Sequence, residues 1–273
     1  GLNVFFIIYC PYEIKNNLPS AAFLQSVYSD SVGIGYIFIA NLVASAATIL
    51  LLFPEMLSSS WRFKSKLWKK MIVFALPLML AGLAGITNET IDRILLSHLL
   101  PPSIAASEVG VYGAYYKLSI IMTLFIQTFR FAAEPFFFAQ EKERNAKQTY
   151  ADVMKFFTII TAVIFLGVMI YYYLVQQLIG AEFHDARGLV IVPILLLANL
   201  FLGIYYNLAV WFKLTEKTQV GAYLAIFGAI ITLMLNFALI PVLGFEGSAW
   251  TTLICYFSMA VVSYLLGRKH YPI

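Results

Sequence analysis

Seven long apolar segments, separated by short polar or proline-containing connections, constrain the fold of this chain more than any other feature. Each segment has about the 20 residues that an α-helix needs to cross a bilayer. Helices are favoured inside lipid because every backbone polar group must be satisfied internally. The alternating pattern of membrane-barrel strands is missing from these segments. We therefore predict an all-α, polytopic transmembrane helix bundle with spans at residues 32–53, 71–100, 109–138, 153–178, 189–212, 220–240 and 247–266.

The composition supports lipid as the solvent for most of the protein surface. Hydrophobic residues make up 61% of the 273 positions and charged residues only 12%, whereas a soluble domain is about a quarter charged. A soluble fold of this length would need more polar side chains to cover its surface.

Basic side chains are distributed unevenly over the connections. Of the 18 lysines and arginines, 13 fall in or beside alternate connections, 2 in the intervening connections and 3 inside the spans. The positive-inside rule predicts this alternation for a correctly counted set of helices, and it places the basic connections in the cytoplasm. The net charge of +4 therefore reflects topology, and we expect no nucleic-acid partner.

The beginning of the chain carries a short apolar run, residues 2–10, of about half the spanning length. Because the chain opens with Gly1 and not with Met, we expect it to start inside a helix and to be a fragment of a longer protein. Residues 11–31 contain prolines and asparagines and are predicted to form a loop. Pro54 is predicted to end the first full span.

Two pairs of opposite charges lie inside the spans at helical spacing. Glu89 and Arg93 are four residues apart, as are Arg130 and Glu134, so each pair can meet on one helix face. For Glu89 and Glu134 we predict structural pairing with these arginines. Charges inside a membrane are costly and normally face a protein interior or a wet cavity.

The intramembrane cations also predict a binding site. Asp92 is about eight residues from the end of its span, and Lys117 is about eight from the start of the next, which predicts similar depths. We hypothesise a polar patch of Asp92, Arg93 and Lys117 that faces a cavity, with Arg130 deeper. Arginine binds phosphate well. The alternative is that these charges only neutralise one another between helices.

Three sequence segments resemble bacterial polysaccharide flippases. The first reads Ile-Asp-Arg-Ile-Leu-Leu at residues 91–96, followed by Glu-Val-Gly-Val-Tyr-Gly-Ala-Tyr-Tyr-Lys-Leu-Ser at 108–119. The second is Phe-Arg-Phe-Ala-Ala-Glu-Pro-Phe-Phe-Phe at 129–138. The third is Leu-Asn-Phe-Ala-Leu-Ile-Pro-Val-Leu-Gly at 235–244, with Gly-Ser-Ala-Trp at 247–250. Their order and spacing are similar to those of O-antigen translocases in the multidrug/oligosaccharidyl-lipid/polysaccharide exporter superfamily.

The resemblance implies a two-lobe exporter that works by alternating access. Residues 1–60 would hold part of helix 5, an outer loop and helix 6 of the first lobe; residues 61–70 would be a basic cytoplasmic linker, and 71–273 the second six-helix lobe, helices 7–12. The expected cargo is an undecaprenyl-pyrophosphate-linked oligosaccharide, flipped across the bacterial inner membrane for O-antigen or capsule biosynthesis. The resemblance also places Arg93, Lys117 and Arg130 on helices that line a cationic cavity. Expected partners are membrane lipids, glycan-assembly proteins and the rest of the first lobe.

The sequence leaves three alternatives to a flippase open. A multidrug or cation antiporter of the same superfamily would share the fold but favour an acidic, apolar pocket. A membrane-embedded glycan polymerase or acyltransferase would need large outer loops or a catalytic His/Asp group. A seven-helix receptor or scaffold would need a complete first helix. Since Cys10, Cys255 and the three histidines have no metal-ligand spacing, we expect no enzyme activity, cofactor or metal.

Overall fold

The computed structural model of the protein describes residues 5–16, 19, 21–29, 31–33, 35–58, 63–215 and 217–270. These residues form helices and connections and contain no strand. Seven helices are long and apolar enough to cross a membrane, which confirms the predicted all-α, multi-pass membrane bundle. The chain divides into two compact units, Gly1–Ser65 and Lys66–Ile273, at a point inside the predicted linker. Residues 2–4 of the first apolar run, Arg62 of the linker and residues 271–273 lie outside the described residues.

The described residues of the first unit form one long helix and three short ones. The long helix is α4, Gly35–Ser58, and its apolar side chains are mostly exposed. Two predictions for this unit are wrong. The expected loop at 11–31 contains helical turns, and α4 continues through Pro54 instead of ending there. The missing N–H of Pro54 removes only one hydrogen bond, and only four residues follow it, so the cost stays local. The short elements are η1 (Phe5–Tyr9), α2 (Cys10–Lys15) and α3 (Ala21–Val27).

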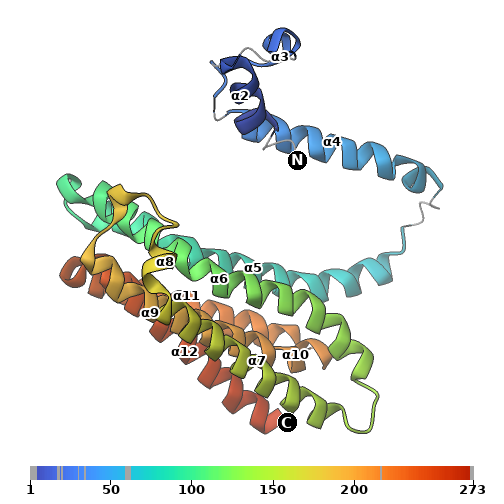
Figure 1. Ribbon diagram of the computed structural model, residues 1–273. Helices are drawn as coiled ribbons and strands as arrows, with labels where there is room; N and C mark the ends of the chain where they lie inside the picture. The colour runs from blue at the N-terminus through green and yellow to red at the C-terminus, as the bar shows by residue number, and fades with distance from the viewer. Residues whose placement is uncertain are drawn as a thin grey trace. The chain divides into compact units, whose positions relative to one another are not determined.

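In the described part of the second unit, six long helices form a bundle, and their directions alternate along the chain (Figure 1). This alternation gathers the basic connections at one end of the bundle, which we call the basic end, and the other connections at the outer end. The long helices are α5 (Ser65–Leu99), α6 (Pro102–Gln140), α7 (Ala146–Ile170), α9 (Ala186–Leu208), α11 (Thr218–Leu243) and α12 (Phe245–His270). The short ones are α8 (Tyr172–Gln176), η2 (Ala181–Phe183) and α10 (Val210–Leu214).

Helix α6 begins earlier than the sequence pattern predicts. It starts at Pro102, not at Val109, and runs for 39 residues, which is about 58 Å at 1.5 Å per residue. Proline is favoured at the first position of a helix, because its fixed φ suits the helix and its missing N–H would have no partner there. Every residue of α6 is therefore seven positions further from the start of its helix than the sequence pattern predicts.

The core of the second unit is centred on α9, which packs against α6, α7 and α12. Tyr115 and Leu195 are among the fully buried side chains in the outer half. Gly188 is required at the start of α9, because a Cβ atom there would overlap the Tyr115 ring. Many large apolar side chains on the outside of the helices are exposed, as expected for a surface solvated by lipid.

A charged cluster joins three helices at the outer end. Arg187 donates one hydrogen bond to Glu108 Oε1 at 2.9 Å and another to Asp185 Oδ2 at 2.8 Å. Its guanidinium carbon also lies 5.1 Å from the ring centre of Phe245, the first residue of α12. Asp185 caps α9 by accepting from the Arg187 backbone N–H. These bonds from Arg187 lower the pKa of the Asp185 carboxyl below its usual value of 3.8.

Candidate functional site

A chamber of about 430 Å³ lies inside the second unit, between α5, α6, α9, α10, α11 and α12. Its lining residues come from the middle of α5 and α12 and from the basic-end halves of α6 and α9. The chamber therefore occupies the half of the bundle that carries the basic connections. Its lining combines apolar side chains with a smaller number of charged and amide side chains.

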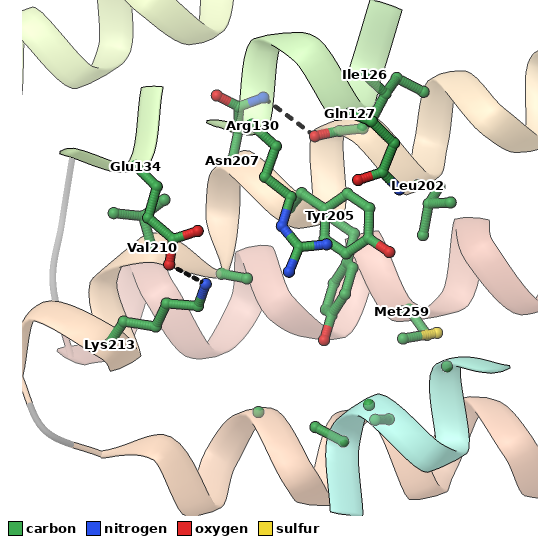
Figure 2. A pocket seen from close by; sticks show the side chains of 18 of the residues that line it. Ile126, Gln127, Arg130, Glu134, Leu202, Tyr205, Asn207, Val210, Lys213 and Met259 are labelled. Atoms are coloured by element: carbon green, nitrogen blue, oxygen red, sulfur yellow. Dashed lines mark hydrogen bonds and ion pairs between the residues drawn. The ribbon is translucent and has the colours of Figure 1, made fainter. Parts of the chain in front are cut away.

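Small residues on α5 and a polar stripe on α6 create this space. On α5, Ala81, Gly82 and Gly85 line the chamber and leave room that larger side chains would fill. On α6, Gln127, Arg130 and Glu134 also line it, because residues three or four apart lie on one face of a helix. Figure 2 shows the Gln127 and Arg130 side chains beside this hollow.

Arg130 is a cation of the chamber that has no carboxylate within ion-pair distance among the described residues. Its guanidinium carbon lies 4.6 Å from the ring centre of Tyr206 on α9. Such a cation–π contact attracts the charge to the ring without neutralising it. The guanidinium N–H groups thus keep the capacity to bind an anionic oxygen.

Glu134 forms an ion pair, but with a different partner from the one that helical spacing suggests. Its Oε1 accepts a hydrogen bond from Lys213 Nζ on α10, as the dashed line in Figure 2 marks. The predicted pairing with Arg130 on the same helix is not found among the described residues. The contact joins the basic ends of α6 and α10, and it leaves Arg130 unpaired.

Glu89 on α5 is the remaining charged residue of the chamber lining. It interacts through space with both Arg130 and Arg93, but the predicted ion pair with Arg93 does not form at contact distance among the described residues. The lining therefore carries two carboxylates, Glu89 and Glu134, and two cations, Arg130 and Lys213. It is balanced in charge, whereas the resemblance implies a cationic cavity.

Two buried amides add hydrogen-bonding capacity to the chamber. Asn88 and Asn207 line it, and each has an Oδ1 with no hydrogen-bond partner in the described part of the chain. Asn207 donates from Nδ2 to the Gly203 carbonyl of its own helix at 3.0 Å. A buried oxygen without a partner is uncommon and costly, so these two amides are places where the bundle carries unsatisfied polar groups beside the chamber. Sequence reasoning missed Asn88, whose signal is its position beside Glu89 on the same helix.

Asp92 does not face the chamber. It is 1% exposed and accepts hydrogen bonds from Tyr112 Oη at 2.8 Å, Asn236 Nδ2 at 2.7 Å and Thr252 Oγ1 at 3.1 Å. Ser248 Oγ and Asn236 Oδ1 are 3.1 Å apart. This network joins α5, α6, α11 and α12 in the outer half of the bundle, and it corrects the prediction that Asp92 belongs to a cavity patch.

Arg93 and Lys117 also lie outside the chamber lining. Arg93 is half-buried, and its guanidinium carbon is 4.7 Å from the Tyr116 ring centre. Lys117 is exposed. Asp92 is buried in its hydrogen-bond network, whereas the Lys117 side chain is exposed. The three predicted patch residues therefore do not line the chamber together.

These features define the class of the protein as a polytopic helical membrane protein with a polar chamber in one half of its bundle. Comparison with protein families, curated proteins and solved structures finds no match for the chain. No group of three or more His, Cys, Asp or Glu side chains is placed to hold a metal ion within the described residues.

Proposed function

We propose that the chain is the second lobe, with an adjoining piece of the first, of a transporter that flips a lipid-linked oligosaccharide across the bacterial inner membrane. The cargo would carry a diphosphate between its isoprenoid chain and its sugars. The observation that carries the proposal is Arg130, a guanidinium that lines the chamber and has no carboxylate within ion-pair distance among the described residues.

The chemistry of the chamber suits such a headgroup. A guanidinium donates two parallel hydrogen bonds to a phosphate, and it does so more strongly where water is largely excluded. The side-chain amide of Gln127 also lines the chamber, and an amide both donates to and accepts from sugar hydroxyls. Glu134 is already neutralised by Lys213, which reduces its repulsion of an anionic cargo.

The two halves of the bundle differ in a way that fits alternating access. The basic-end half contains the chamber. The outer half is filled by apolar side chains and by the Asp92 network. An inward-facing state of a flippase needs this asymmetry, because the headgroup enters from the cytoplasmic leaflet while the outer path is closed.

Complementation in cells tests the proposal. A strain that lacks the intact gene is supplied with wild type, Arg130→Gln or Arg144→Gln. Arg144 is exposed in the connection after α6 and does not line the chamber, so it is the matched control. We expect Arg130→Gln to lose surface glycan and to accumulate lipid-linked sugar in the inner leaflet, and Arg144→Gln to behave as wild type. Normal surface glycan with Arg130→Gln, at wild-type protein levels, would contradict the proposal.

A second candidate is an exporter of cationic drugs, and Glu89 is the observation that favours it. Its carboxylate lines the chamber without a contact ion pair among the described residues. Tyr205, Tyr206 and Tyr256 line the same space, and aromatic rings attract organic cations. Drug susceptibility that rises with Glu89→Gln and not with Arg130→Gln would support this candidate over the flippase.

A further inference from the structure

Lys117 on α6 is an exposed cation that no described residue neutralises. Its side chain is exposed at the surface of the second unit, and none of the ion pairs among the described residues includes it. It does not line the chamber. Neither the chamber nor the charged cluster at the outer end therefore accounts for this charge.

The depth of Lys117 follows from that outer cluster. Arg187 contacts Glu108 on α6 and Phe245 on α12, and two of the membrane-crossing helical segments begin at Arg187 and Phe245 themselves. Glu108 is therefore level with the outer edge of the spans. Lys117 is nine residues further along α6, or about 14 Å at 1.5 Å per residue. A hydrocarbon core is about 30 Å thick, so Lys117 lies near its middle.

A charge at this depth needs a partner that ordinary lipid does not supply. Charged side chains inside a membrane are costly and are normally paired or face water. The lysine side chain reaches roughly 6 Å from its Cα atom, so it cannot carry its ammonium group back to the headgroup region. Anionic lipid headgroups are therefore too far away to neutralise Lys117.

The helix face that carries Lys117 is otherwise apolar and uncovered. Ile121 and Leu124 follow it at helical spacing, and they are 40% and 62% exposed. Gly113 precedes it by one turn, and a Cβ atom at that position would meet nothing within 4 Å. Small residues allow two transmembrane helices to approach closely. Apolar side chains beside a single cation thus favour contact with a helix over a water-filled cavity.

We propose that the face formed by Gly113, Lys117, Ile121 and Leu124 docks another transmembrane helix, and that this helix presents an aspartate or glutamate to Lys117. Charge complementarity identifies the occupant, because a carboxylate neutralises an ammonium group within lipid. A two-fold contact with the same face of a second copy would bring Lys117 against Lys117, so the partner is a different segment. The inference concerns assembly and is independent of the cargo of the chamber.

Site-specific photocrosslinking of the intact protein in its cell membrane tests the inference. The photoreactive residue p-benzoylphenylalanine replaces Ile121, and crosslinked peptides are mapped by mass spectrometry. We expect a crosslink to an apolar segment of spanning length that carries Asp or Glu near the bilayer centre. The same residue at Val163, which is exposed on α7 and lines no part of the chamber, is the matched control and should crosslink to lipid. Crosslinks to lipid alone from position 121, or to a segment without a carboxylate, would overturn the inference.

A paired substitution tests the charge itself. Lys117→Met should lower the yield of the crosslink about threefold or more, because it leaves the carboxylate of the partner unpaired. Replacing that carboxylate by leucine in the same variant should restore the yield, since two apolar partners leave no unpaired group. Lys142→Met, exposed in the connection after α6, is the control. An unchanged yield with Lys117→Met would contradict the inference.

Access of water to the face provides a second measurement. Lys117→Cys is treated with a charged, membrane-impermeant methanethiosulfonate reagent, and the parent protein gives the background because Cys10 and Cys255 are both buried. We expect labelling no higher than this background, since a docked helix excludes water from the face. Rapid labelling of Lys117→Cys from either side of the membrane would show a wet cavity in place of a docked helix and would overturn the inference.

Discussion

The guanidinium carbon of Arg130 lies 4.6 Å from the ring centre of Tyr206, and these two residues connect α6 to α9 across the chamber. The ring orients the guanidinium and leaves its charge available. Arg93 makes the same kind of contact with Tyr116, but Arg130 lines the chamber and Arg93 does not. We therefore propose Arg130 as the cation that meets a ligand.

The aromatic face at position 206 is therefore predicted to matter more than its hydroxyl. Tyr206→Phe keeps the cation–π contact, and we expect transport close to wild type. Tyr206→Leu removes it, and we expect binding of the diphosphate lipid to weaken about twofold to fivefold, since such contacts contribute about 0.5–1 kcal/mol. Titration of the purified protein with a fluorescent polyprenyl diphosphate measures this. Equal weakening by Phe and Leu would show that the hydroxyl, and not the ring, is needed.

The Asp92 network predicts different results for two neighbouring threonines. Thr252 Oγ1 donates to Asp92 at 3.1 Å, whereas the buried Thr251 Oγ1 has no partner in the described part of the chain. Thr252→Val should lower the melting temperature by about 3 °C, because one lost hydrogen bond costs about 1 kcal/mol. Thr251→Val should leave it unchanged or raise it. Thermal unfolding followed by tryptophan fluorescence checks both, and an equal loss in the two variants would argue against the network.

The ion pair of Glu134 and Lys213 predicts a charge-swap result. Glu134→Gln and Lys213→Gln should each reduce stability, and the exchanged double variant, Glu134→Lys with Lys213→Glu, should recover most of the loss. The half-buried position of both groups suggests a coupling of about 1 kcal/mol. The free energies of unfolding of wild type, Glu134→Gln, Lys213→Gln and the double variant with both substitutions form a double-mutant cycle, which gives the coupling. Additive effects of the two single substitutions would mean that the contact contributes nothing.

The outer charged cluster predicts a dependence on pH. Hydrogen bonds from Arg187 lower the pKa of Asp185 below 3.8, so the folded carboxyl binds its proton less readily than the unfolded one. The ionised Asp185 carboxylate adds to the free energy of unfolding, and this stabilisation is fully present above about pH 4. The stabilisation is lost as the pH falls through the lowered pKa. Asp185→Asn should remove this stabilisation, and Arg187→Gln should raise the pH at which the protein unfolds in acid. Free energies of unfolding measured between pH 2.5 and 6 test this prediction. The same loss of stability at low pH in wild type and in Asp185→Asn would contradict it.

The fold is more predictable from the sequence than the site is. Apolar runs of spanning length and alternating basic connections are local signals, so they predict the seven long helices. The site depends on contacts between distant residues. Lys213 pairs with Glu134 from 79 positions away, and Asn236 reaches Asp92 from 144 positions away, which a pattern of spacing on one helix does not reveal. The position of Arg130 inside a span indicates a candidate site residue, because a charge there is costly. The sequence does not reveal that Lys117 is exposed while Asp92 is buried.

Transbilayer movement of a single defined cargo tests the central claim most directly. The intact protein is reconstituted in vesicles with a polyprenyl-diphosphate oligosaccharide in one leaflet, and its appearance in the other is followed for wild type, Arg130→Lys and Arg130→Gln. We predict rapid movement with wild type, slower movement with Arg130→Lys, and a loss of about tenfold or more with Arg130→Gln, since a hydrogen bond to a charged group contributes about 1.5–3 kcal/mol. Movement at the wild-type rate in Arg130→Gln would contradict the account.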